Sequence, residues 1–175
     1  MHKDSNMFID TKKIGAKGLL LEDSITPDSQ LLIEEGSSFF EPLKFSVHFS
    51  RDGQKIRARG HIHTLITIPC VNCLEAFQFQ VDSEFDLILF PVHLIDTNHS
   101  ALQSDEMEYI FFEGDEIDLE KVLMEQVNLF VPYNPLCSTH CKGICPYCGT
   151  NLNNEECHCE NRETKNDMSL FFSKI

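Results

Sequence analysis

The cysteines are the residues of this chain best suited to chemistry, and most of them lie close together near the end of the sequence. Six of the eight fall within the stretch CSTHCKGICPYCGTNLNNEECHC, residues 137–159, together with His140 and His158. Thiols grouped in this way form disulfides, perform redox chemistry or bind a metal ion. The spacing of the cysteines and the composition of the chain distinguish these three possibilities.

The eight cysteines form four close pairs, which matches the ligand number of two metal sites. The pairs are Cys70 with Cys73, Cys137 with Cys141, Cys145 with Cys148, and Cys157 with Cys159. A structural zinc site takes four ligands in a closed tetrahedron, and two such pairs supply them. A thiol redox enzyme instead relies on a lone Cys-x-x-Cys near the start of a helix. The sequence therefore predicts Zn²⁺ as the cofactor, with one or two ions per chain.

The first predicted site has the most specific pattern, CPYCG. Its ligands are Cys145, Cys148, Cys157 and Cys159. In a zinc knuckle the chain turns sharply around the metal, and Gly149 permits the left-handed backbone that such a turn requires. The eight-residue loop GTNLNNEE then leads to the second pair.

The second predicted site joins two distant parts of the chain. Its ligands are Cys70, Cys73, Cys137 and Cys141. The CVNC segment lies between two expected strands, where a hairpin projects its thiols outward, and the other pair follows the expected helix. Two alternatives stay open: Cys137 and Cys141 complete the first site, or His140 or His158 replaces a cysteine. For each histidine, an exposed loop residue is the simpler interpretation.

The overall composition is that of an acidic globular protein outside the membrane. The 175 residues carry a formal net charge of −14, and 42% of them are hydrophobic. No stretch approaches the roughly 18 uninterrupted apolar residues of a membrane span, and the N-terminus lacks the apolar run of a signal peptide. We therefore expect a cytoplasmic protein, in which thiols stay reduced and disulfides are rare.

No pattern in the sequence favours catalysis. Paired carboxylates, a Ser/His/Asp set and a glycine-rich phosphate loop are not evident. Zinc held by four protein ligands also has no open position for a water molecule, so it does not act as a catalytic centre. We expect no enzymatic activity and no small-molecule substrate.

The elements that must position the cysteines have periodic signatures. Residues 43–49, LKFSVHF, alternate as a half-buried strand does, Asp52-Gly53 is a typical hairpin turn, and residues 55–70 and 75–90 alternate again. The segment 107–114 suits a short strand. A helix is expected over 118–130, with Asp118 as N-cap and an apolar stripe at helical spacing. The stripe contains Leu119, Val122, Leu123, Val127 and Phe130.

These elements predict an α+β fold: a mainly antiparallel β-sheet or barrel-like domain with one packed helix and a C-terminal zinc-knuckle segment. The expected division is a β-rich core at 1–136, a cysteine-rich metal-binding segment at 137–160 and a tail at 161–175.

One strand has a basic outer face, which is a candidate RNA-binding surface. The face consists of Lys55, Arg57, Arg59, His61 and His63. Cations in such a row track successive phosphates. The alternative is an ordinary solvated face, neutralised by the acidic segment 96–125. That acidic segment is itself either a solubilising loop or a mimic of phosphate that binds a basic partner.

Three segments of the sequence resemble the YceD-like family, the bacterial and plastid proteins named for accumulation of large-subunit (23S) ribosomal RNA. The segments are CVNCLEAFQFQVDSEF, EIDLEKVLMEQVNLFVPYNPLC and HCKGICPYCGTNLNNEECHC. The most specific match is the Cys-x-Gly-x-Cys-Pro-x-Cys-Gly-x-Asn-Leu-Asn pattern at 141–153. The resemblance covers roughly residues 40–160, while the ending NDMSLFFSKI matches loosely.

The resemblance implies a cytoplasmic, non-enzymatic factor that supports ribosomal RNA processing and large-subunit assembly, with ribosomal RNA or large-subunit ribosomal proteins as partners. It also implies a β-rich α+β domain with a C-terminal metal-binding segment. Some family members lack C-terminal cysteines, so metal is not the whole of the family's function. The rival hypothesis is a zinc-stabilised protein-interaction adaptor outside ribosome assembly, and a thiol redox enzyme is the third.

Overall fold

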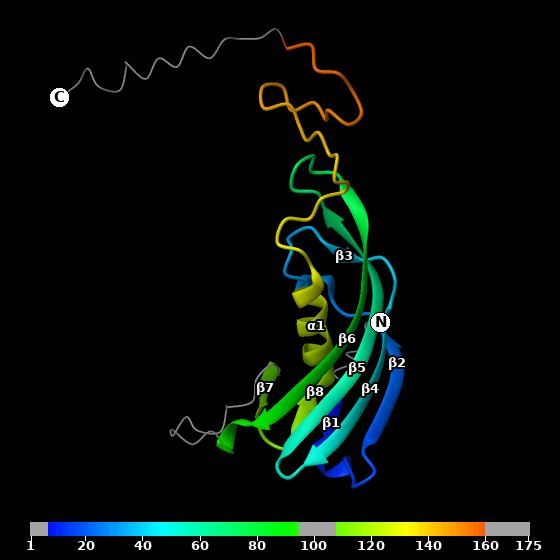
Figure 1. Cartoon of the computed structure of the whole chain (residues 1–175), viewed down its shortest axis with the longest axis vertical. Helices are drawn as coiled ribbons and strands as arrows, with labels where there is room; N and C mark the ends of the chain where they lie inside the picture. Colours follow the sequence, from blue (N-terminus) through cyan, green and yellow to red (C-terminus); the bar gives the residue numbers. More distant parts are fainter. Residues whose placement is uncertain (1–6, 95–107, 160–175) are drawn as a thin grey trace, which may run out of the picture.

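The computed structural model describes residues 7–94 and 108–159, and it places three long antiparallel strands at the centre of the molecule (Figure 1). They are β4 (Leu43–Asp52), β5 (Lys55–Pro69) and β6 (Ala76–Pro91). Their order in the sheet is β4-β5-β6, so each strand pairs with its neighbour in sequence. The alternation expected from the sequence is confirmed: Ile56, Ile62 and Ile66 are buried on one face of β5.

Shorter elements complete the sheet on both sides. The strands β2 (Leu19–Ile25) and β7 (Glu108–Phe112) form its two edges, and β3 (Ser38–Phe39) pairs with β5. The pairing of β7 with β6 is parallel, whereas the other pairs of this sheet are antiparallel. Within the described residues the sheet stays open between these two edges. The fold is therefore α+β and mainly antiparallel as predicted, but no barrel is closed.

The first hairpin turn lies one residue later than the Asp52-Gly53 signal suggests. Asp52 pairs with Lys55 at the end of the ladder, so Gly53 and Gln54 are the two loop residues. Gly53 has φ +62°, a conformation that glycine adopts without steric cost.

The helix α1 (Leu119–Phe130) covers the inner face of the sheet beside β6 (Figure 1). It begins as predicted, because the Asp118 carboxylate accepts a hydrogen bond of 3.1 Å from the Lys121 N–H. Leu119, Val122, Leu123 and Val127 are buried. The prediction that Phe130 belongs to the buried stripe was wrong, because this residue is 45% exposed.

The remaining elements connect these layers. They are β1 (Phe8–Asp10), β8 (Glu116–Asp118), and the short 3₁₀ turns η1 (Thr11–Lys13), η2 (Ser29–Leu31) and η3 (Val92–Leu94). The strands β1 and β8 pair with each other, and β8 leads directly into α1. None of the helices in the described ranges is long and apolar enough to cross a membrane.

The apolar core ends before the cysteine-rich segment begins. Val131 is the last residue that packs against the core in the described chain. The segment that follows lies beyond the tip of the β5–β6 hairpin, at one end of an elongated molecule (Figure 1). The division at residues 136/137 stays a prediction. The proposed tail 161–175 and the first part of the acidic segment, residues 96–107, lie outside the described residues.

Candidate metal centres

The structure gathers the eight cysteines into two groups of four. The group that we name the clamp cluster contains Cys70, Cys73, Cys137 and Cys141. The group that we name the knuckle cluster contains Cys145, Cys148, Cys157 and Cys159. In each group all four sulfur atoms lie within 4.8 Å of one another. These are the two groupings predicted from spacing, and the alternative in which Cys137 and Cys141 join the first site is not found.

The closest sulfur–sulfur distances are near the edge length of a metal tetrahedron. In the clamp cluster the Cys70–Cys141 distance is 3.8 Å and the Cys73–Cys137 distance is 3.7 Å. In the knuckle cluster, Cys157 Sγ lies 3.6 Å from Cys148 Sγ and 3.2 Å from Cys145 Sγ. A tetrahedral ion with metal–sulfur bonds of about 2.3 Å places its ligands about 3.8 Å apart, whereas a disulfide requires about 2.05 Å. The spacing therefore fits a shared ion better than covalent sulfur pairs.

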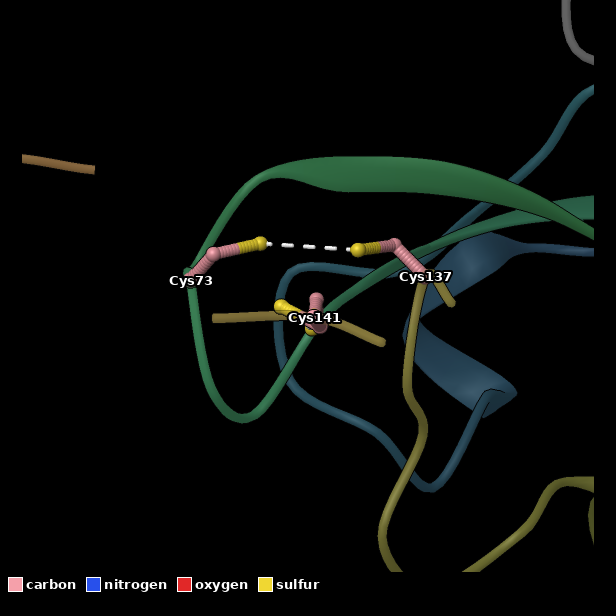
Figure 2. Close-up of side chains that lie close together, drawn as sticks. Cys73, Cys137 and Cys141 are labelled. Atoms are coloured by element: carbon pink, nitrogen blue, oxygen red, sulfur yellow. Dashed lines mark hydrogen bonds between the residues drawn. The ribbon is translucent and has the colours of Figure 1, made fainter. Parts of the chain in front are cut away.

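The clamp cluster ties the β5–β6 hairpin to the chain that follows α1. Figure 2 shows the Cys73 and Cys137 side chains pointing toward each other from these two segments, with Cys141 beside them. The backbones are also joined directly, because the Val71 N–H donates to the Pro135 carbonyl at 3.0 Å. Cys70 and Cys73 are buried. The cluster thus connects residues that are more than 60 positions apart in the sequence.

The two Cys-x-x-Cys turns, CVNCLE and CPYCGT, have the same hydrogen bonds at equivalent positions. In the first, Leu74 N–H donates to Cys70 C=O at 2.8 Å and Cys70 N–H to Glu75 C=O at 2.9 Å. In the second, Gly149 N–H donates to Cys145 C=O at 2.9 Å and Cys145 N–H to Thr150 C=O at 2.8 Å. Both clusters therefore contain the same kind of knuckle turn.

The residue after the second cysteine of each turn has a left-handed backbone. Gly149 has φ +75°, as predicted from its position. Leu74 has φ +63° and is the single non-glycine residue of the described chain with positive φ. A side chain in this conformation costs roughly 1–2 kcal/mol, so the fold tolerates strain at the clamp knuckle. A leucine gives no sequence signal for this conformation, and sequence reasoning missed it.

Backbone and side-chain donors stabilise some of the thiolates. The Thr150 hydroxyl and backbone N–H lower the pKa of Cys148 to about 6. Burial raises the pKa of Cys70, but N–H groups of Cys137, Cys73 and Asn72 outweigh this effect and lower it to about 6. Hydrogen bonds of this kind favour the charged form of a thiol, which is the form that binds metal.

Other thiols of the same clusters resist ionisation. Burial and the neighbouring thiols raise the pKa of Cys137 to about 12. Interactions with Cys157 and Cys148 raise the pKa of Cys159 to about 12. Four adjacent thiols cannot all lose their protons while no positive charge lies between them. A divalent cation supplies that charge, and soft thiolates suit Zn²⁺ and similar ions.

The histidines near the clusters are not among the gathered ligands. In the described part of the chain both groups consist of cysteines alone, and His140 and His158 are exposed. The simpler interpretation, an exposed loop histidine, therefore fits each of them.

The candidate RNA-binding stripe faces carboxylates of the neighbouring strand. Arg57 forms a bidentate ion pair with Asp86, at 2.7 and 2.6 Å, and Arg59 lies 3.0 Å from the same carboxylate. His61 and His63 approach Asp82 at 2.5 and 3.4 Å, and Lys55 lies over the Phe90 ring at 5.6 Å. Within the described ranges the stripe is thus paired with residues of β6, and its neutralisation by the acidic segment stays a prediction because residues 96–107 lie outside those ranges. RNA binding by these residues stays a prediction.

The identity of the chain follows from comparison with known proteins. A family model described as large ribosomal RNA subunit accumulation protein YceD matches residues 58–171, a range that contains both clusters. The chain belongs to the YceD family. The resemblance seen in the sequence is thereby confirmed. No solved structure matches.

Curated relatives of this YceD-family chain come from plants and mycobacteria. It is 29% identical over 144 residues to the chloroplastic large ribosomal RNA subunit accumulation protein YCED homolog 1 of Arabidopsis thaliana, covering 70% of this chain and 45% of that protein. For the homolog of the same name from Zea mays the identity is 26% over 148 residues, covering 71% and 50%. An uncharacterized protein of Mycobacterium tuberculosis is 31% identical over 166 residues, covering 90% and 76%. The chain therefore spans about half the length of the plant relatives it matches.

Proposed function

We propose that each cluster binds one Zn²⁺ ion as a closed structural site. The support is the convergence of four sulfur atoms within 4.8 Å in both clusters, on two knuckle turns with the same hydrogen bonds. Four protein ligands leave no open position, so the ions do not activate water. Zinc at the clamp cluster fastens the C-terminal segment to the hairpin, and zinc at the knuckle cluster shapes the end of the molecule.

On this basis the protein acts as a non-enzymatic accessory factor in accumulation of large-subunit ribosomal RNA. The family name and the names of the plant relatives support this role. The protein works in the cytoplasm, during processing of 23S ribosomal RNA and assembly of the large subunit. Its partners are ribosomal RNA or large-subunit ribosomal proteins, and it has no small-molecule substrate.

Elemental analysis tests the metal content. We expect two zinc ions per chain in freshly purified protein, and eight thiols that react with a thiol reagent only after a chelator is added. One zinc per chain removes the clamp site from the proposal. A metal-free protein with reactive thiols contradicts both sites.

Sedimentation of cell extract tests the role in assembly. We expect the protein to migrate with precursors of the large subunit, and we expect 23S ribosomal RNA to decrease when the protein is depleted. The rival hypothesis, a zinc-stabilised adaptor outside ribosome assembly, predicts migration away from ribosomal particles and unchanged 23S ribosomal RNA.

The ion pairs of the candidate RNA-binding stripe allow a sharper test of RNA contact than substitution of its basic residues. Replacing Asp86 by asparagine frees Arg57 and Arg59 without removing either positive charge. If this face binds phosphates, Asp86→Asn should bind large-subunit RNA more tightly and with a steeper salt dependence. The matched control is Glu84→Gln, which removes one negative charge from the same strand but no ion pair with an arginine. Equal effects of the two substitutions indicate a general charge effect and no specific contact.

A further inference from the structure

The loop that joins the two halves of the knuckle cluster also contacts the clamp cluster. This loop, residues 149–156, lies between Cys148 and Cys157, so a metal ion at the knuckle cluster closes it at both ends. Its Asn153 donates from Nδ2 to the Sγ of Cys141, a member of the clamp cluster, at 3.3 Å. A ligand of one cluster is therefore hydrogen-bonded by a residue that the other cluster holds in place.

Two neighbouring groups fix the orientation of the Asn153 side chain. Its Oδ1 accepts a hydrogen bond of 2.8 Å from the Lys142 N–H. Its backbone N–H and its Nδ2 donate to the Asn151 Oδ1 at 2.9 and 3.0 Å. Every polar atom of the amide thus has a partner, and the donor toward Cys141 has little freedom to turn away.

The same loop contacts the hairpin side of the clamp cluster. Asn151 and Asn154 both donate to the Glu75 carboxylate, at 2.8 and 2.9 Å. Glu75 follows Cys73 by two residues, and its carbonyl closes the CVNC turn. In the segment just before the loop, Ile144 N–H donates to Asn72 C=O at 3.1 Å. Gly143 permits this approach, because a Cβ there would lie 3.2 Å from the same oxygen.

We propose that Asn153 couples the two cysteine clusters, so that zinc at the knuckle cluster raises the zinc affinity of the clamp cluster. The inference rests on the proposed binding of metal to both clusters. When the knuckle cluster is filled, the loop is already ordered and Asn153 is in place for Cys141. When it is empty, binding at the clamp cluster must also order the loop, which weakens that binding. Coupling of this kind is reciprocal, so zinc at the clamp cluster strengthens the knuckle cluster by the same factor.

The coupling factor is measurable from three association constants. A chelator competition gives the overall constant for binding two zinc ions to the intact chain. A knuckle-deficient variant, Cys148→Ser/Cys159→Ser, gives the constant of the clamp cluster alone. A clamp-deficient variant, Cys73→Ser/Cys137→Ser, gives that of the knuckle cluster alone. The overall constant divided by the product of the two single-site constants is the coupling factor.

We expect a coupling factor of about 10 to 100, which is the usual effect of a residue that orients a metal ligand. In the Asn153→Leu background the factor should fall toward 1. The matched control is Asn134→Leu, which removes an exposed amide from the segment before Cys137 and should leave the factor unchanged. Circular dichroism of each variant verifies that the sheet is intact.

The possible outcomes separate the coupling from the proposed function. A factor of 1 in the intact chain overturns the coupling while leaving two independent zinc sites. A large factor that persists in Asn153→Leu overturns the role of Asn153. If Asn153→Leu lowers the zinc affinity of the clamp cluster by the same factor whether the knuckle cluster is filled or empty, the Asn153–Cys141 hydrogen bond acts only locally. That result also overturns the proposal. Failure of the intact chain to bind zinc at either cluster overturns the proposed function itself.

Discussion

The left-handed residue of each knuckle turn provides a quantitative test of the metal sites. Gly149 has φ +75°, and a Cβ built on it meets no atom within 4 Å. Alanine at this position therefore changes the backbone energy and little else. We expect Gly149→Ala to weaken zinc binding at the knuckle cluster.

The size of the effect follows from two opposing contributions. A Cβ in the left-handed region costs roughly 1–2 kcal/mol. The lower conformational freedom of alanine in the unfolded or metal-free loop offsets about 0.4–1 kcal/mol of that cost. The difference is about 1 kcal/mol, which corresponds to a zinc affinity about fivefold lower. A chelator competition on the clamp-deficient variant, which retains the knuckle cluster alone, measures this change.

The clamp knuckle should respond in the opposite direction. Leu74 has the equivalent position with φ +63°, and its side chain is 65% exposed, so glycine removes strain and little apolar burial. We expect Leu74→Gly to raise the zinc affinity of the clamp cluster by about two- to fivefold.

The chain offers a matched glycine away from the cysteines. Gly36 has φ +82°, a Cβ added to it also meets no atom within 4 Å, and it lies in the loop between η2 and β3. Gly36→Ala should lower the thermal stability and leave zinc affinity unchanged. The reasoning is refuted if Gly149→Ala binds zinc as tightly as the wild type, or if Leu74→Gly binds it more weakly.

Three further substitutions test the fold. Leu123 is fully buried in the core, so Leu123→Ala should lower the free energy of unfolding by about 2–5 kcal/mol in a urea titration. Asp118→Ala removes the N-cap of α1 and should cost about 1 kcal/mol in the same assay, while Glu125→Ala on the exposed face of that helix should have little effect. Arg57, and then Arg59, lower the pKa of Asp86 from 3.8. The stabilisation by this carboxylate is complete only above about pH 5, roughly one pH unit above the ordinary pKa, and it is lost as the pH falls through the lowered pKa, so metal-free Asp86→Asn should lose less stability than wild type between about pH 5 and pH 2. Equal losses in the two proteins contradict a stabilising Asp86 ion pair.

Much of the fold can be predicted from the sequence, because the hydrophobic residues repeat with a strand period in the central strands and with a helical period in α1. The alternation of 43–49 and 55–70 is strong, and Asp118 begins a helix whose buried stripe is evident in the spacing of its leucines and valines. The parallel pairing of β7 is not visible, since nothing in a five-residue strand specifies which neighbour it joins or in which direction. A barrel-like closure is compatible with the strand pattern because the sequence does not show where a sheet ends.

The cysteine groupings are predictable because ligand spacing is a local property, and the hairpin places CVNC where the second pair can reach it. The residues that surround the ligands are not predictable in the same way. Leu74 has an unfavourable left-handed backbone conformation, which a leucine in the sequence does not predict. Asn153 is recognisable as part of a motif, but its hydrogen bond to Cys141 depends on the folded path of the loop. The partners of the basic stripe depend on the register of β5 with β6, which sets Arg59 opposite Asp86.

If the clusters bind zinc as proposed, the end of the apolar core at Val131 has a consequence for cells that are short of zinc. The sheet and α1 share a buried apolar core, so we expect them to fold without metal. The segment from residue 132 to 159 contributes nothing to that core, so we expect its order to depend on metal binding by its thiols and on its hydrogen bonds. When zinc is scarce, we expect the sheet and α1 to stay folded while the segment 132–159 is unstructured. Any partner that recognises the folded end would then distinguish zinc-replete from zinc-starved protein, even when the amount of protein is the same.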